Sequence, residues 1–186
     1  MFIQTELTPN PNSIKFFPES EVAPNGPVHF SSIDEAVGKS TLAVKLFAIH
    51  NVQAVFFGED FITITKSNES DWDALRPEIL MTIMDYSAAG LGALDHPSAS
   101  NTDIDLENLS EIEKQIYEII ETKVRPSVAM DGGDITYRGF ENGIVKLQLR
   151  GSCSGCPSAS ITLKNGIESM LKHFVPEVEA VEAVDE

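Results

Sequence analysis

The feature that most constrains the fold of this chain is a stretch of small and polar residues near its middle. Residues 88–105 show no hydrophobic period and are punctuated by glycine, proline and serine. A stretch of this kind is typical of a linker between domains. With 186 residues, 42% of them hydrophobic, each side of the linker can still build a small core. We therefore predict two small α+β domains, at 1–87 and 106–178, joined by a flexible linker and followed by an acidic tail at 179–186.

The first predicted domain mixes strand-like and helix-like runs. Two runs rich in β-branched and aromatic residues, at 52–57 and 61–66, are separated by a Gly-Glu-Asp turn and predict a hairpin. Ser32 and Glu35 have the spacing of a capping box and predict the start of a helix. The other expected elements are a strand at 13–17, a helix at 41–49 and a helix after Ser70.

The second predicted domain begins with an amphipathic helix. Apolar residues recur at helical spacing over 106–124, and the helix is expected to end before Pro126. Strands follow at 135–140 and 144–150, joined by an Asn-Gly turn that favours a tight hairpin. A last helix begins near Pro157, because proline suits the first helical turn. The expected order of elements is α-β-β-α.

The charge and hydropathy of the chain argue against two classes of partner. The net charge is −16, with 5 basic and 13 acidic residues up to position 100 and 8 basic and 16 acidic residues after it. Neither part is basic enough for a nucleic-acid-binding domain. No apolar run approaches the roughly 18 residues of a membrane-spanning helix, and the N-terminal residues do not resemble a signal or transit peptide. We expect no nucleic-acid or membrane partner and a cytoplasmic location, with the mitochondrial matrix as the alternative for a processed organelle protein.

The chemistry of the chain is concentrated in its only two cysteines, Cys153 and Cys156. Their Cys-x-x-Cys spacing lets both sulfurs face one point, and the predicted helix start beside Cys156 favours a thiolate. Gly151 and Gly155 leave room for a ligand close to the backbone. Three interpretations of such a pair are open: binding of a soft metal or cluster, dithiol redox exchange, or two cysteines without a chemical role at a helix start. The antiparallel hairpin expected before the motif favours metal or cluster binding over a thioredoxin-like site, which follows a βαβ unit.

Two cysteines alone cannot complete a metal site. Structural zinc takes four ligands and a [4Fe–4S] cluster takes four cysteines, and none of the four histidines extends the motif in a zinc-like pattern. A symmetric dimer would bring four sulfurs to its two-fold axis. We expect Cys153 and Cys156 on an exposed, mobile loop in the metal-free protein, because such a shared site lies at the surface.

A second set of candidate residues is the turn Asp131-Gly132-Gly133-Asp134. Its two aspartates could bind a cation or act as acid and base. Aspartates that bracket two glycines are more often turn-formers, because their carboxylates accept hydrogen bonds from the nearby backbone. We therefore favour the structural role for both aspartates.

These motifs together resemble a known family. The second half is similar to the NifU C-terminal domain and the first half to the Nfu N-terminal domain. The residues that carry the resemblance are Val124-Arg125-Pro126, Asp131-Gly132-Gly133-Asp134-Ile135, Gly151-Ser152-Cys153-Ser154-Gly155-Cys156-Pro157-Ser158, Leu163-Lys164-Asn165-Gly166-Ile167-Glu168 and Val175-Pro176-Glu177-Val178, with Thr8-Pro9-Asn10-Pro11-Asn12, Val55-Phe56-Phe57-Gly58 and Asp60-Phe61-Ile62-Thr63-Ile64-Thr65-Lys66 in the first half. One departure from the family pattern is Met130, where a polar or basic residue is expected.

The resemblance implies an iron–sulfur cluster scaffold or carrier, which is not an enzyme. Cys153 and Cys156 match the family's ligand positions, so two chains would share one [4Fe–4S] cluster, with [2Fe–2S] as the alternative. The expected partners are a second copy of the chain in the loaded state, apo iron–sulfur client proteins and upstream cluster donors. A thiol–disulfide oxidoreductase that uses the same two cysteines is the competing hypothesis, and a zinc-bridged interaction module is a third. The first domain has no cysteine, and we expect it to recognise partner proteins or to modulate dimerisation.

Overall fold

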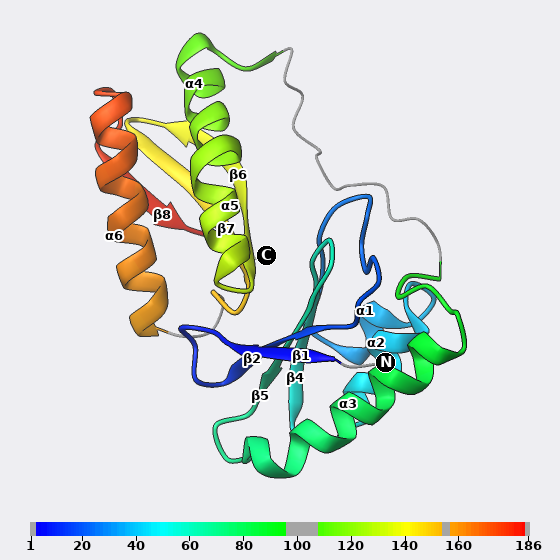
Figure 1. Ribbon diagram of the computed structural model, residues 1–186. Helices are drawn as coiled ribbons and strands as arrows, with labels where there is room; N and C mark the ends of the chain where they lie inside the picture. Colours follow the sequence, from blue (N-terminus) through cyan, green and yellow to red (C-terminus); the bar gives the residue numbers. More distant parts are fainter. Residues whose placement is uncertain (1–2, 96–107, 154–156, 185–186) are drawn as a thin grey trace. The chain divides into compact units, whose positions relative to one another are not determined.

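The computed structural model describes residues 3–95, 108–153 and 157–184 (Figure 1). The chain divides into two compact units, Met1–Ser100 and Asn101–Glu186. Both units contain helices and a sheet, so the predicted class of two α+β domains is confirmed. The part of the predicted linker at 96–105 lies outside the described residues.

The first unit is built on a five-stranded antiparallel sheet. Its strands are β1 (Gln4–Leu7), β2 (Ser13–Phe17), β3 (Val28–Phe30), β4 (Val52–Phe57) and β5 (Ile62–Lys66). Their order in the sheet is β1-β2-β5-β4-β3. The predicted hairpin is confirmed as β4 and β5, and the predicted strand at 13–17 is β2. The short strands β1 and β3 were not predicted from the sequence.

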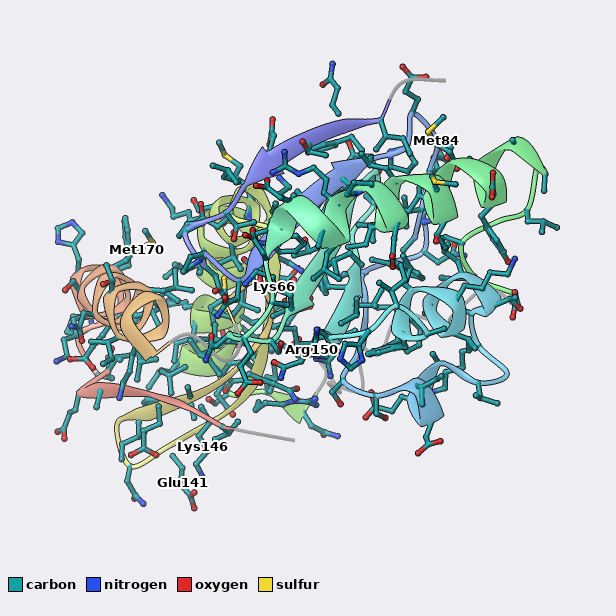
Figure 2. All side chains as sticks on the ribbon, turned by 90° about the horizontal axis from the view of Figure 1, so that it is seen from below. Lys66, Met84, Glu141, Lys146, Arg150 and Met170 are labelled. Carbon is teal, nitrogen blue, oxygen red and sulfur yellow. The ribbon has the colours of Figure 1, made fainter. Side chains whose placement is uncertain are left out.

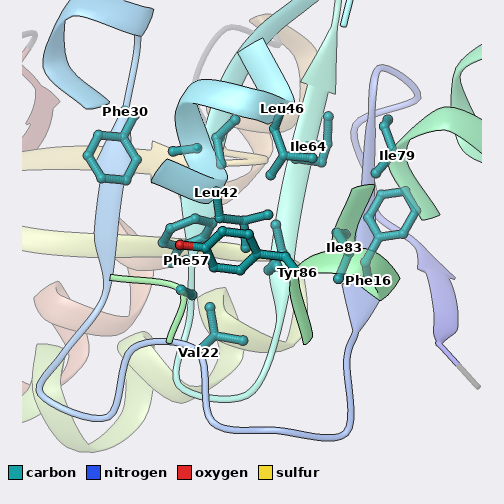
Figure 3. Packing of buried hydrophobic residues seen from close by; sticks show 14 of the residues in the cluster. Phe16, Val22, Phe30, Leu42, Leu46, Phe57, Ile64, Ile79, Ile83 and Tyr86 are labelled. Atoms are coloured by element: carbon teal, nitrogen blue, oxygen red, sulfur yellow. The ribbon is translucent and has the colours of Figure 1, made fainter. Parts of the chain in front are cut away.

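The helices of the first unit lie on one face of this sheet (Figure 1). They are α1 (Ile33–Ala36), α2 (Thr41–Phe47) and α3 (Trp72–Ala88). Ser32 caps α1 by accepting a hydrogen bond from the N–H of Glu35, which confirms the predicted helix start. Figure 3 shows how side chains of α2 and α3 meet those of the sheet, with Leu46 of α2 beside Ile64 and Ile79 of α3 beside Phe16. The alternation of apolar residues along the strands therefore supplies one continuous core.

The residues after α3 remain attached to the first unit up to Asp95. The Asp95 carboxylate accepts hydrogen bonds from the N–H and the hydroxyl of Thr41, at 2.9 and 2.8 Å. The N–H of Asp95 donates to the carbonyl of Lys39 at 2.9 Å, and Ala93 is buried in the core. The stretch that the sequence assigned to a linker from residue 88 thus begins with a segment packed on the first unit.

The second unit opens with a helix that runs past the predicted stop. It consists of α4 (Glu111–Ile119), a π-helical segment η2 (Ile120–Val124) and α5 (Arg125–Met130). The prediction that the helix ends before Pro126 was wrong. Proline normally clashes with the carbonyl four residues earlier, but here it follows a wider π turn and occupies the first turn of α5.

A hairpin forms the central part of the second unit. Strands β6 (Gly133–Glu141) and β7 (Ile144–Gly151) pair antiparallel, as predicted. Asn142 and Gly143 have φ of 51° and 79°, the left-handed conformation that a tight Asn-Gly turn requires. Across the end of this hairpin the Lys146 Nζ lies 2.9 Å from the Glu141 carboxylate (Figure 2).

The sequence did not predict the last strand of the second unit. Helix α6 (Pro157–Phe174) leads into β8 (Ala180–Ala183), which pairs parallel to β7 inside the predicted acidic tail. The order of elements is therefore α-β-β-α-β instead of α-β-β-α. The Glu168 carboxylate of α6 accepts a hydrogen bond from the N–H of Val181 at 3.1 Å and so ties this strand to the helix. Among the helices of the described residues, none is long and apolar enough to cross a membrane.

Candidate functional site

Cys153 lies in the turn that connects β7 to α6. Strand β7 ends at Gly151, whose φ of 71° turns the chain away from the sheet. Helix α6 begins at Pro157, as predicted. Cys156 lies outside the described residues, so the structure places one of the two predicted ligands.

A glycine forms the floor beneath the Cys153 side chain. Gly133, the first residue of β6, is the register partner of Gly151. A Cβ at position 133 would lie 2.8 Å from the Cys153 Sγ and 2.6 Å from the carbonyl oxygen of Arg150. Both distances are shorter than any ordinary contact, so only glycine lets the thiol and the strand approach this closely.

Ser152 binds the cysteine turn to the segment that follows α5. Its hydroxyl donates a hydrogen bond to the Asp131 carbonyl, and its N–H donates to the Gly132 carbonyl at 3.2 Å. The same hydroxyl lies 3.8 Å from the Cys153 Sγ. Two loops that are distant in the sequence are thereby held together at the thiol.

The expected exposed position of Cys153 was wrong. Its side chain is only 5% exposed and belongs to the core of the second unit. The glycine floor explains this, since a Cβ at Gly133 would push the sulfur out. The pKa of the Cys153 thiol is raised to about 11, above all by burial; the hydrogen bond with Ser152 opposes the rise, and the charges of Asp131 and Asp134 add to it. At neutral pH the thiol is therefore protonated, and binding of a metal ion must displace its proton.

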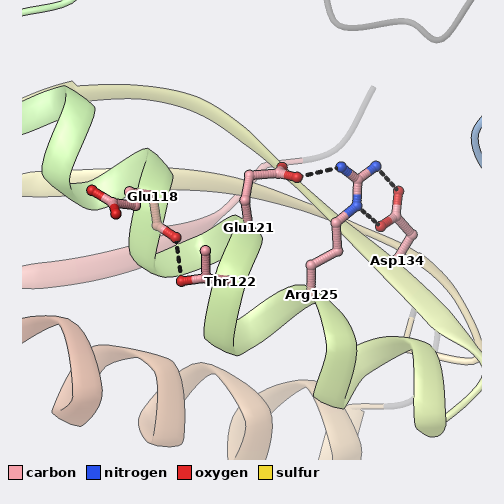
Figure 4. A network of polar contacts seen from close by, with 5 residues as sticks. All are labelled: Glu118, Glu121, Thr122, Arg125 and Asp134. Carbon is pink, nitrogen blue, oxygen red and sulfur yellow. Dashed lines mark hydrogen bonds and ion pairs between the residues drawn. The ribbon is translucent and has the colours of Figure 1, made fainter.

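The aspartates of the turn have structural partners. The Asp134 carboxylate is buried and receives two hydrogen bonds from the guanidinium of Arg125 (Figure 4). Burial disfavours the charge of Arg125, but the hydrogen bonds and charge of Asp134 outweigh it and raise the Arg125 pKa. Asp131 is the C-cap of α5, and its carbonyl accepts from Ser152. These contacts fit the structural role that the sequence favoured for both aspartates.

Within the described residues, no group of three or more histidine, cysteine, aspartate or glutamate side chains is arranged to hold a metal ion. Within these residues, Cys153 is therefore not part of a ready-made metal-binding group. The contact of Arg125 with Asp134 and the role of Gly133 were not predicted from the sequence. A signal for Arg125 was available, because Glu121 and Arg125 are four residues apart on a helix and so can pair.

Two family profiles match the chain. The profile described as scaffold protein Nfu/NifU N terminal matches residues 3–90, and the profile described as NifU-like domain matches residues 116–182. The matches fall on the two units in the order that the sequence predicted.

Three relatives match over nearly the whole chain. The mitochondrial NFU1 iron–sulfur cluster scaffold homolog of Drosophila ananassae is 51% identical over 99% of this chain and 64% of its own length. The Homo sapiens protein of the same name is 50% identical over 99% of this chain and 72% of its own length. The mitochondrial NifU-like protein 4 of Arabidopsis thaliana is 49% identical over 98% of this chain and 65% of its own length. With about half of its residues identical to these relatives, the chain belongs to the Nfu/NifU-like scaffold protein family.

Proposed function

We propose that this protein carries an iron–sulfur cluster and transfers it to apo-proteins. The cluster is its cargo, held by Cys153 and Cys156 of two chains, as a [4Fe–4S] cluster or alternatively a [2Fe–2S] cluster. The observation that carries the proposal is a thiol at the strand-to-helix turn of a NifU-like domain, placed over a glycine floor. The names of the relatives, which describe iron–sulfur cluster scaffolds, support it.

A cluster shared between two chains suits a carrier better than a permanent cofactor site. Two chains that each contribute two thiolates release the cluster when they separate. This reversibility is what delivery requires, and turnover of a substrate is not part of the proposed role.

The first domain has no cysteine and is proposed to recognise clients or cluster donors. Transfer measured with and without residues 1–95, the part of the first unit that the structure describes together with its first two residues, tests this, and unchanged transfer to every client would contradict it. The relatives are named mitochondrial, which supports the mitochondrial matrix over the cytoplasm as the compartment of this chain. Fractionation of the source cells checks that assignment.

The test of the proposed function is anaerobic reconstitution with iron and sulfide. Iron, acid-labile sulfide and oligomer mass are measured together. About two irons and two sulfides per chain in a dimer are expected, as four-cysteine ligation of a [4Fe–4S] cluster requires. A colourless protein without bound iron would contradict the proposal.

Cysteine variants complete this test. Cys153→Ala and Cys156→Ala are each expected to abolish cluster retention, because one thiolate per chain then remains, which is two of the four that the cluster needs. Circular dichroism monitors the fold, and Thr122→Ala, a helix substitution at an exposed hydroxyl, is the control. Reduction of insulin disulfides by the wild type at catalytic rates would favour the thiol–disulfide oxidoreductase instead.

A further inference from the structure

The guanidinium of Arg125 joins two carboxylates from different elements. Its Nε lies 2.8 Å from Asp134 Oδ1 and its Nη2 lies 3.3 Å from Asp134 Oδ2. Its Nη1 lies 2.7 Å from Glu121 Oε2 (Figure 4). The Asp134 side chain is 6% exposed, whereas those of Arg125 and Glu121 are 28% exposed. This bidentate contact fixes the orientation of the Asp134 carboxylate as well as its distance from Arg125, which a lysine ammonium cannot do.

The π-helical segment η2 aims Arg125 at the sheet. Ile116, Ile120, Val124 and Val128 are all buried, at intervals of four residues. In a regular α-helix of 3.6 residues per turn, each interval of four rotates a side chain by about 40° relative to the one before. The wider turn of η2 removes part of this drift and keeps the apolar row on the core. Arg125, next to Val124, consequently lies at the edge of the core, beside the start of β6.

The contact with Asp134 acts on the floor beneath the thiol. Asp134 directly follows Gly133, and Arg150 is its register partner on β7. A shift of Asp134 would move Gly133, the residue beneath the Cys153 Sγ, where an added Cβ would lie only 2.8 Å from the sulfur. Ligand positions need to be held to within about 0.5 Å for tight binding. Arg125 thus acts on Cys153 indirectly: it contacts Asp134, and the neighbouring Gly133 lies beneath the Cys153 side chain.

We infer that Arg125 is a positioning residue for Cys153, acting through Asp134 and the Gly133 floor to hold the thiol in place for its ligand. The inference rests on the proposed function for the nature of that ligand. That the position of the Cys153 thiol depends on Arg125 does not require a cluster, and this dependence is measured separately in the metal-free protein.

The first experiment measures alkylation of Cys153 in the metal-free protein. A Cys156→Ala background leaves Cys153 as the single thiol, and iodoacetamide reports its accessibility. Arg125→Gln is expected to raise the alkylation rate in a protein that remains folded by circular dichroism. Arg125→Lys, which keeps the charge but loses the fork, is expected to lie between wild type and Arg125→Gln. Asp134→Asn provides a second route to the same result if Arg125→Gln fails to fold.

The matched control breaks another ion pair of the same domain. Glu168 lies 2.6 Å from Lys172, with a side chain that is 26% exposed. Glu168→Gln is expected to lower the thermal midpoint without changing Cys153 alkylation. If folded Arg125→Gln is alkylated at the same rate as the Cys156→Ala protein that keeps Arg125, the inference is overturned. It is also overturned if Glu168→Gln raises the alkylation rate by as much as Arg125→Gln does.

The second experiment uses the reconstituted protein with both cysteines. Arg125→Gln is expected to lose iron to a chelator roughly tenfold faster than wild type or more, the usual cost of removing an outer-shell partner of a metal ligand. Arg125→Lys should restore part of the retention. If the wild type binds no iron, the proposed function fails while the alkylation result still decides the positioning role. If the wild type binds iron and Arg125→Gln retains it equally well, the positioning role fails alone.

Discussion

Each domain buries a serine whose hydroxyl joins two distant segments, but the two serines have different consequences. Ser40 accepts a hydrogen bond from the N–H of Ala43 at 3.0 Å and donates one to the Ala93 carbonyl at 2.5 Å. It therefore caps α2 and fastens the segment after α3. Ser152 donates to the Asp131 carbonyl beside the candidate ligand Cys153. A buried serine thus stabilises only the fold in the first domain, whereas in the second it stabilises the fold and also helps to hold the Cys153 thiol in place.

The buried residues around the two serines extend this contrast. The Ser40 hydroxyl bonds backbone groups of Ala43 and Ala93, two members of a core that also holds large apolar side chains such as Leu46 and Phe57. Ser152 lies among glycines, a cysteine and the buried carboxylate of Asp134. Large side chains fill the first core, whereas in the second a glycine lets the backbone of β6 lie close to the Cys153 Sγ. The comparison predicts that a substitution in the first core lowers stability alone, whereas a substitution beside Cys153 lowers both stability and ligand retention.

The largest expected effect comes from adding one methyl group at Gly133. Gly133→Ala would place a Cβ 2.6 Å from the Arg150 carbonyl oxygen and 2.8 Å from the Cys153 Sγ. We expect a loss of about 1–3 kcal/mol in the free energy of unfolding, as for overpacked cores, together with loss of iron retention after reconstitution. Urea denaturation and iron analysis measure the two effects.

The matched control for this substitution is Gly166→Ala in α6 of the same domain. No atom lies within 4 Å of a Cβ at Gly166. Because alanine is the better helix former, this change is expected to stabilise the domain by about 0.5–1 kcal/mol and to leave iron retention intact. If both variants changed the free energy of unfolding and the iron retention by the same amounts, the proposed role of Gly133 beneath Cys153 would be contradicted.

The serine pair gives a smaller and more direct test. Ser40→Ala and Ser152→Ala are each expected to cost about 1 kcal/mol, the usual loss for a helix cap or a net hydrogen bond. Only Ser152→Ala should also accelerate Cys153 alkylation and iron loss. If Ser40→Ala changed iron retention as much as Ser152→Ala, the separation between the two domains would be contradicted.

Patterns within one element could be read from the sequence. Richness in β-branched and aromatic residues located β4 and β5, alternation of apolar residues located β7, and the Asn-Gly pair located the hairpin turn that Asn142 and Gly143 make with positive φ. The Cys-x-x-Cys motif located the candidate site between a strand and a helix. Each of these signals depends on residues that are neighbours along the chain, so no tertiary information was needed.

Features that depend on distant residues were missed. Strand β8 lies in an acidic segment with no strand pattern, and it forms because β7 has an edge for it to pair with. The helix passes Pro126 because the π turn keeps Val124 and Val128 in the core. The burial of Cys153 depends on Gly133, twenty residues earlier on another strand. In all three cases packing against another element overrides the local signal.

The smallest expected effect concerns two glutamates, one at a helix start in each domain. Glu35 accepts hydrogen bonds from the N–H and hydroxyl of Ser31. Glu113 accepts the same two from Ser110, and in addition one from the hydroxyl of Tyr137 on β6 at 3.1 Å. The pKa of each carboxyl is lowered from 4.5, in each case chiefly by the hydrogen bond from a backbone N–H.

A carboxyl whose pKa is lowered on folding stabilises the protein above pH 4.5 and loses this contribution as the pH falls through the folded value. Glu35→Gln and Glu113→Gln are therefore expected to be less stable than wild type at pH 7, by under about 1 kcal/mol because water screens both groups. The deficit should shrink as the pH falls below 4.5. It should be larger for Glu113→Gln, and a Tyr137→Phe background should reduce it to that of Glu35→Gln. Urea denaturation between pH 7 and pH 3 measures these differences. A deficit at Glu113 that is independent of pH, or unaffected by Tyr137→Phe, would show that its link between helix and sheet contributes nothing beyond the hydrogen bonds that each carboxylate accepts from a serine.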